Sequence, residues 1–162
     1  MATNQQYNPR GPGSFQGGQR QSGFAPRSDD REDIPTISLQ GIVFGNKPAA
    51  DLFSTQAERA AEEVSRASKE MNKSSQLRRF YDELVMWQEK VGSDDGKFSD
   101  CEPYIRMLKA KAAYAKGRKH VDANFRALFD RLIDQSTSAA TLRQAKLFFE
   151  AFMAYYKIHR AQ

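Results

Sequence analysis

Cysteines, histidines and long hydrophobic runs are scarce in this 162-residue sequence. The single cysteine, Cys101, allows neither an internal disulfide nor a cysteine-based zinc site, which fits a reducing compartment. The first residues contain no apolar signal-peptide region, and no apolar run approaches the ~20 residues needed to span a bilayer. These absences predict a cytoplasmic protein without a membrane partner.

Catalytic and metal-binding motifs are equally scarce. The two histidines, His120 and His159, stand alone, and there is no glycine-rich phosphate loop and no HExxH motif. The carboxylates are dispersed among basic residues, whereas metal-dependent nuclease sites need them clustered. We therefore expect a non-enzymatic protein without cofactor or metal. A ribonuclease that depends on His120 or His159 is the competing hypothesis.

The basic residues outnumber the acidic ones. Lys and Arg total 25 against 20 Asp and Glu, which gives a net charge of +5. A basic surplus favours an anionic partner such as nucleic acid, but a surplus this modest carries weight only where the charges gather. The position of the cations along the chain therefore matters more than their number.

The chain divides into three parts by composition. Residues 1–33 are rich in Gly, Gln, Arg, Ser and Pro, and we predict a disordered tail, either simply solvated or binding RNA loosely. Residues 34–53 hold short apolar segments broken by glycine and proline, which fit either a short hairpin or an extended strap docked on helices. Residues 54–162 have helical periodicity and form the predicted bundle domain.

The predicted fold class is all-α, a compact bundle of about five helices. A capping box formed by Thr55 and Glu58 predicts a first helix from Gln56 to about Met71. The other four helices are expected at about 75–91, from near Asp100 to Gly117 with Pro103 in the first turn, from Asp122 onwards, and at about 139–159.

The third predicted helix concentrates positive charge. Between Tyr104 and Lys119 the chain has no acidic residue and six basic ones, Arg106, Lys109, Lys111, Lys116, Arg118 and Lys119. Cations near a helix C-terminus complement the helix dipole, which explains the last three of them but not the first three. A row of cations at helical spacing is also suited to successive phosphates. We predict that part of this cluster binds phosphate.

Two other helices carry candidate contact residues. Arg78 and Arg79 begin the second helix, where cations oppose the helix dipole, and either a phosphate partner or ion pairs with Asp82 or Glu83 would explain them. The fifth helix is apolar around nearly its whole circumference, so it is either central to the bundle or shared with a partner. The residues that we predict at a subunit interface are Phe148, Tyr155 and Ile158.

Three segments of the chain resemble a known family. They are Ser75–Leu84 (SQLRRFYDEL), Met107–Arg118 (MLKAKAAYAKGR) and Phe149–Lys157 (FEAFMAYYK). In the same order they are similar to segments of the small subunit of type III-A CRISPR effector (Csm) complexes. The likeness covers about residues 55–160, and it leaves out the tail and the 34–53 segment.

This resemblance implies a non-catalytic role in RNA-guided antiviral defence. Copies of such a subunit stack as a filament beside the backbone subunits and the large subunit, and they hold the duplex of target RNA and CRISPR RNA by its backbone. The implied RNA-binding residues are Arg78, Arg79, Lys109, Lys111, Arg118 and Lys157, joined on charge alone by Lys116 and Lys119. The alternative is a structural adaptor or homodimer that bridges subunits without touching RNA.

Overall fold

The computed structural model describes residues 34–160, and the predicted tail at 1–33 lies outside the described residues. Within this range the chain forms five α-helices and one π-helical turn, with no β-strand, so the predicted all-α bundle is confirmed. In chain order the elements are η2 (Leu52–Gln56), α1 (Ala57–Ser65), α2 (Ser74–Val91), α3 (Asp95–Gly117), α4 (Ala123–Gln135) and α5 (Ala139–Arg160).

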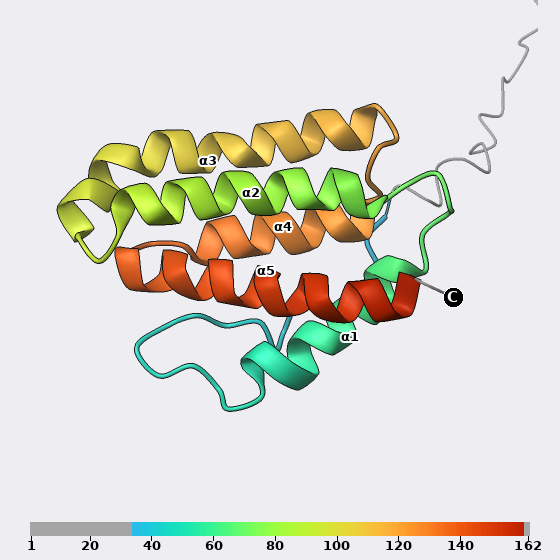
Figure 1. The fold of residues 1–162 in the computed structure, drawn as a ribbon, viewed down its shortest axis with the longest axis horizontal. Coiled ribbons are helices and arrows are strands. Elements are labelled where there is room, and N and C mark those ends of the chain that lie inside the picture. Colours follow the sequence, from blue (N-terminus) through green and yellow to red (C-terminus); the bar gives the residue numbers. More distant parts are fainter. Residues whose placement is uncertain (1–33, 161–162) are drawn as a thin grey trace, which may run out of the picture.

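The helices α2 to α5 lie side by side along the long axis, and α1 lies beneath α5 (Figure 1). Helix α5 packs against α1, α2 and α4, whereas α3 packs mainly against α2 and α4 on the other side of the bundle. The central place of α5 follows from its sequence, because a helix that is apolar all round is stable only when most of its circumference is covered.

Aromatic rings fill the centre of the bundle. The Phe149 ring of α5 lies 5.9 Å from Phe129 of α4 and 5.6 Å from Phe152, and Phe129 lies 5.1 Å from Phe80 of α2. Phe129, Phe149 and Phe152 are fully buried. Burial of each such side chain contributes roughly 1.5–3 kcal/mol relative to exposure, so this cluster is the main source of stability between α2, α4 and α5.

The first helix is shorter than predicted and begins differently. Thr55 lies inside the π-helical turn, and neither η2 nor α1 has a side-chain cap, so the predicted capping box is wrong. Helix α1 ends at Ser65 rather than near Met71, because the next carbonyl groups are bound from elsewhere. The Arg160 guanidinium, at the end of α5, donates hydrogen bonds to the carbonyl oxygens of Ser65, Ala67, Ser68 and Met71.

The third helix begins earlier than predicted. Asp94 caps it by accepting hydrogen bonds from the Gly96 and Lys97 amides at 2.8 and 3.2 Å, so α3 starts at Asp95 and not near Asp100. Pro103, expected in the first turn, therefore lies inside the helix. The predicted start of α4 is right, since the Asp122 carboxylate accepts from the Phe125 amide at 2.8 Å.

Residues 34–51 cross the helices as an irregular strap without strand pairing. The apolar side chains of Ile42 and Phe44 are buried beneath it. Its backbone bonds to α4 side chains: the Phe44 amide donates to Gln135 Oε1 at 2.6 Å, and the Ile42 carbonyl accepts from Arg131 Nε at 3.1 Å. The strap is held in place because its buried polar groups find these partners.

One buried asparagine joins the loops at one end of the bundle. Asn72 is fully buried with a backbone φ of 53°, and its amide bonds to the Val64 carbonyl and to Asp122. Its own carbonyl accepts a 2.6 Å hydrogen bond from the Tyr156 hydroxyl. Burial raises the pKa of Tyr156 to about 12, so this hydroxyl keeps its proton over the ordinary pH range. The Asn72 backbone amide donates to the His120 carbonyl, after α3, at 2.9 Å. We call Asn72, Val64, His120, Asp122 and Tyr156 the Asn72 joint.

Candidate nucleic-acid interface

The basic residues in the middle of α3 face two different neighbours. Lys109 Nζ lies 2.6 Å from an Asp134 carboxylate oxygen of α4, and Lys111 Nζ lies 2.5 Å from Glu83 of α2. The two lysines therefore project to opposite flanks of the helix instead of forming one row. Both pairs are exposed enough to be weak, so an RNA phosphate could replace either carboxylate at little cost.

Arg106 has a structural role. Its guanidinium donates to the Ile133 carbonyl at 2.8 Å and to the Ser136 carbonyl at 3.2 Å, and it pairs with Glu102 at 2.9 Å. The first two oxygens lie at the C-terminal end of α4, where backbone carbonyls lack helical partners. Arg106 therefore caps α4 from α3, and the phosphate-binding hypothesis does not need it.

Contacts between α2 and α3 place Arg79 next to the end of α3. The two helices run antiparallel, because Glu83 pairs with Lys111 while Trp87, further along α2, stacks on Tyr104 with ring centroids 5.7 Å apart. Arg79 precedes Glu83 by one turn, so it lies beside the turn of α3 that follows Lys111. That turn ends in Arg118, whose guanidinium donates to the Tyr114 hydroxyl at 3.0 Å.

Arg78 and Lys157 lie on the other side of α2. They line a shallow hollow of about 460 Å³ between α2 and α5, together with Tyr81 and Glu150. Arg78 pairs with Asp82 at 2.8 Å, and this hydrogen bond raises the pKa of the Arg78 guanidinium. The Arg79 side chain is exposed and makes no ion pair or hydrogen bond among residues 34–160. The ion-pair explanation therefore fits Arg78 and does not fit Arg79.

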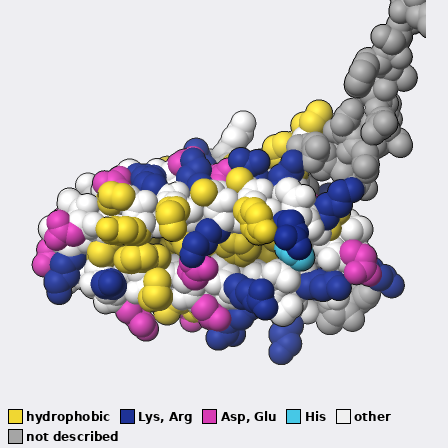
Figure 2. All heavy atoms as spheres, turned by 90° about the horizontal axis from the view of Figure 1, so that it is seen from above, with side chains coloured by type: hydrophobic (Ala, Val, Ile, Leu, Met, Phe, Trp, Pro, Cys, Tyr) yellow, Lys and Arg dark blue, Asp and Glu magenta, His cyan; other side chains and the backbone are white. Residues whose placement is uncertain are grey.

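Four exposed cations thus follow one another around one end of the bundle, from α5 across α2 to α3. We call this set the basic band, and its members are Lys157, Arg78, Arg79 and Arg118. Lys116 and Lys119 lie next to it along the chain. In Figure 2 the Lys and Arg side chains are more numerous toward the right-hand end of the molecule, and acidic side chains are spread over both ends. Sequence analysis identified all four cations but not their arrangement.

The three residues predicted at a subunit interface differ in their burial. Phe148 is fully buried, with its ring 6.3 Å from Phe44 of the strap, so its assignment to a subunit interface is wrong. The residue faces outward from the four long helices, and the strap covers it. Tyr155 is partly buried and Ile158 is 63% exposed, so both are accessible on α5.

Sequence analysis missed an exposed apolar surface on α2 and α3. Met86, Tyr104, Met107 and Tyr114 are all about half exposed or more. The three- and seven-residue spacing of the α3 members Tyr104, Met107 and Tyr114 was the available signal, because it keeps them on one face of a helix. The richer apolar content of α5 favoured a prediction of the interface on that helix instead.

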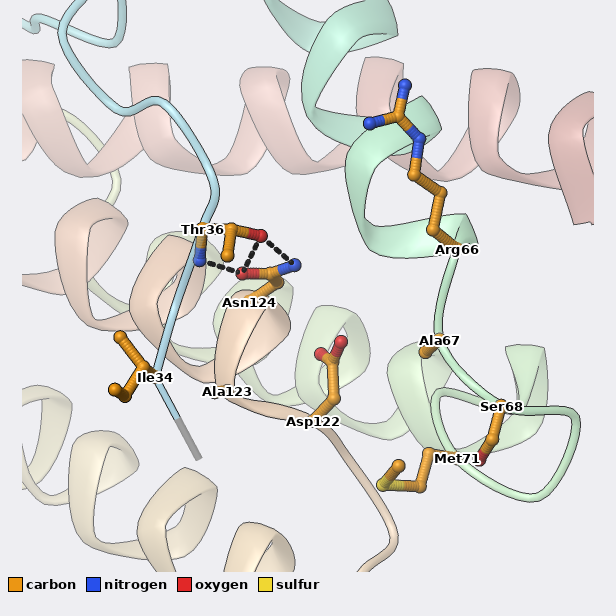
Figure 3. Close-up of a pocket in the computed structure, with 9 residues that line it drawn as sticks. All are labelled: Ile34, Thr36, Arg66, Ala67, Ser68, Met71, Asp122, Ala123 and Asn124. Carbon is orange, nitrogen blue, oxygen red and sulfur yellow. Dashed lines mark hydrogen bonds between the residues drawn. The ribbon is translucent and has the colours of Figure 1, made fainter. Parts of the chain in front are cut away.

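A separate pocket of about 270 Å³ lies where the strap meets the start of α4 (Figure 3). In Figure 3 the Thr36 and Asn124 side chains point toward each other, whereas Arg66 points away from them. The one acidic lining residue, Asp122, is already bound to Asn72 and to the Phe125 amide. The polar groups of this pocket therefore hold the strap and the helix start together.

Asp130 of α4 is the one carboxylate with a raised pKa among the described residues. Burial is the main cause, and Arg126 and Lys109 oppose it. Its Oδ1 is buried without a hydrogen-bond partner, and Arg126 Nε is 3.6 Å from Oδ2. Because the pKa is higher in the folded than in the unfolded protein, folding favours the protonated acid. Stability from this group is present at low pH and is lost as the pH rises through the folded pKa.

Replacing Asp130 with asparagine is therefore expected to raise the melting temperature at pH 7 by no more than about a few degrees. The gain should shrink as the pH falls toward the ordinary carboxyl range, where the wild-type acid is protonated as well. Thermal unfolding of both proteins between about pH 4 and pH 7 tests this. Asp134→Asn, which removes the ion pair to Lys109 on the same helix, is the control and should not stabilise the protein. Equal melting temperatures at pH 7 would contradict the expectation.

Over residues 34–160, no group of three His, Cys, Asp or Glu side chains is placed to hold a metal ion. None of the helices in the same range combines the length and the hydropathy that a bilayer crossing requires.

The described part of the chain is a helical bundle that presents the basic band and an exposed apolar surface. The family model described as Csm2 Type III-A matches residues 47–162. The chain therefore belongs to this family, the small subunits of the type III-A CRISPR (Csm) complex, and the resemblance noted in the sequence is confirmed. Neither a curated protein nor a solved structure matches the chain.

Proposed function

We propose that this small subunit holds RNA through the basic band by contacts to the sugar–phosphate backbone, without cleaving it. The observation that supports this most is the continuity of Lys157, Arg78, Arg79 and Arg118 around one end of the bundle. The four cations come from three helices and are exposed. Side chains anchored on rigid helices keep their spacing, so they can meet successive phosphates of one strand.

Recognition of this kind is blind to base sequence. Contacts to phosphates supply affinity and register, whereas base edges supply sequence information, and the guide RNA provides that by pairing. Each phosphate contact with a single strand contributes a salt dependence of about 0.7 in the slope of log affinity against log salt. One copy with about four contacts binds weakly, and several copies on one RNA multiply that affinity through effective concentration.

Stacking of copies is the second part of the proposal. Tyr155 and Ile158 of α5 offer an apolar contact near the basic band, and the neighbouring copy or a backbone subunit would cover them. Lys109, Lys111, Lys116 and Lys119 would add charge beside the bound strand. In this role the protein works inside the cytoplasmic antiviral complex, next to the backbone and large subunits, and needs no catalytic group or cofactor of its own.

Reversing three charges of the basic band tests the proposal. In Arg79→Glu/Arg118→Glu/Lys157→Glu each reversal removes two units of charge, so the net charge falls from +5 to −1. We expect single-stranded RNA of any sequence to bind at least about 100-fold more weakly, because three attractive phosphate contacts become repulsive. Fluorescence anisotropy at about 50 and 200 mM salt measures the affinity and its salt slope.

The matched control is Lys47→Glu/Lys97→Glu/Arg143→Glu, which changes the net charge equally at exposed sites away from the basic band. The proposal requires this control to bind nearly as well as the wild type. Equal losses in both triple variants would mean that only net charge matters, and no binding by the wild type would favour the structural adaptor. The accessible Tyr155 and Ile158 are the observation that supports the adaptor.

A further inference from the structure

The acidic side chains at the start of the chain are confined to five residues. Residues 1–28 contain no Asp or Glu, whereas residues 29–33 read DDRED. Four carboxylates and one guanidinium give this run, which we call the acidic segment, a net charge of −3. So much charge of one sign in so few residues is attracted to cations that lie within a Debye length, about 10 Å at 0.1 M salt.

The described chain begins directly after the acidic segment, and it begins beside a group of cations. Pro35 lines a hollow of about 190 Å³ together with Lys116 of α3 and Arg126 of α4. Arg118 of the basic band and Lys119 follow Lys116 within one turn. We call Lys116, Arg118, Lys119 and Arg126 the α3-end cluster. Residue 29 precedes Pro35 by six residues, so the whole acidic segment is tethered within about 22 Å of Pro35.

The strap fixes the place at which the acidic segment joins the fold. The Thr36 amide donates to Asn124 Oδ1 at 2.7 Å, and Figure 3 shows Ile34 and Thr36 beside the start of α4. The N-terminal end of a helix carries a partial positive charge, which favours carboxylates nearby. The acidic segment is therefore attached between the positive end of α4 and the cations at the end of α3.

Two members of the α3-end cluster can exchange their present partners easily. Arg118 donates to the Tyr114 hydroxyl, a neutral acceptor, at 3.0 Å, and Arg126 Nε lies 3.6 Å from an Asp130 carboxylate oxygen. A guanidinium binds a carboxylate more strongly than a neutral oxygen, and exposed ion pairs contribute little. A carboxylate of the acidic segment would therefore improve on the first contact and replace the second at little cost.

We propose that the acidic segment docks on the α3-end cluster of its own chain and competes there with RNA. Carboxylates and phosphates bind the same guanidinium and ammonium groups, so the two ligands exclude each other at Arg118. A short tether gives the segment an effective concentration in the millimolar range, which favours its own chain over a second copy. The docking rests on position and charge, whereas the competition also rests on the proposed function.

Neutralising the acidic segment tests the competition. In Asp30→Asn/Glu32→Gln/Asp33→Asn, made in the full chain, the loss of three negative charges raises the net charge from +5 to +8. We expect this variant to bind single-stranded RNA about fivefold more tightly at about 50 mM salt, because the competing carboxylates are lost. The gain should fall below about twofold at 200 mM salt, where the docking in the wild type is already screened. Fluorescence anisotropy measures both affinities.

The matched control is Glu58→Gln/Glu89→Gln/Asp100→Asn, which changes the net charge equally at exposed sites on α1, α2 and the early part of α3. It should bind RNA within about twofold of the wild type, since these sites are remote from the α3-end cluster. A control that gains as much as the acidic-segment variant overturns the competition, because net charge alone would then explain both. An acidic-segment variant with unchanged affinity overturns it as well.

Amide chemical shifts of the ¹⁵N-labelled full chain, recorded without RNA, test the docking by itself. Neutralising the acidic segment should shift the signals of residues 116–120 and of Arg126, and the control should leave them unchanged. Unchanged signals overturn the docking whatever RNA does, and so do shifts that depend on protein concentration, which would indicate a second copy. If no form of the chain binds RNA, the proposed function fails and the competition with it, while the spectra still decide the docking.

Discussion

Replacing Asn72 with alanine is expected to lower the free energy of unfolding by about 3–4 kcal/mol, a large part of the stability of a domain this size. The Asn72 amide is fully buried, where Nδ2 donates to the Val64 carbonyl and to Asp122, and Oδ1 accepts from the Asp122 amide at 2.9 Å. Alanine leaves these groups without partners. Alanine also keeps the Cβ at φ 53° without the polar side chain that lets asparagine tolerate this left-handed conformation, which costs an ordinary non-glycine residue roughly 1–2 kcal/mol.

Asn72→Gly separates the two contributions. Glycine loses the same side-chain hydrogen bonds but adopts positive φ without strain, so it should be about 1 kcal/mol more stable than the alanine variant. Urea denaturation followed by circular dichroism gives both free energies. A loss below about 1 kcal/mol for alanine would contradict the role assigned to the Asn72 joint. The joint also ties the ends of α2, α3 and α5 that carry the basic band, so RNA affinity should fall in the variants that loosen it.

Replacing Phe44 with alanine is expected to cost about 3 kcal/mol and to release the strap. Only 8% of Phe44 is exposed, and its ring packs against Phe148 of α5. Removing the ring leaves a cavity and weakens the hold of the strap on α4 and α5. The released strap would uncover Phe148, so the variant should be cleaved by protease within residues 34–51 and should associate more strongly as its concentration rises.

Val43→Ala is the matched control, one residue away and 53% exposed. It should change the unfolding free energy by less than about 0.5 kcal/mol and leave the strap resistant to protease. Limited proteolysis with mass spectrometry and denaturant unfolding distinguish the two variants. If Phe44→Ala lowers the unfolding free energy as little as Val43→Ala is expected to, the strap contributes little to stability and Phe148 does not depend on its cover.

The two faces of this protein have different consequences for its assembly. The basic band consists of exposed side chains, and its Arg78–Asp82 ion pair is weak, so under the proposed function a phosphate would replace that carboxylate without disturbing the fold. Helices α2 and α3 add large exposed apolar side chains, Met86, Tyr104, Met107 and Tyr114, of the kind that a protein surface covers.

Local patterns in the sequence determined a large part of the fold. The three- and four-residue spacing of apolar residues predicted α2, α4 and α5 closely, and Asp122 was identified correctly as the start of α4. Such patterns work because a helix repeats every 3.6 residues and its first turn needs a nearby acceptor for free amide groups. The three segments that resemble the family also contain every cation of the basic band.

Only the tertiary structure decided which groups meet. Arg160 binds the carbonyl oxygens at the end of α1, almost a hundred residues earlier in the chain. Asp134 forms an ion pair with Lys109, and the strap covers Phe148. In each case the deciding partner is distant in sequence, so no pattern within a few residues reports it. The sequence determines which side chains are available and which helices carry them, but burial, capping by distant groups and ion pairing arise from packing, and these set the surface that remains for partners.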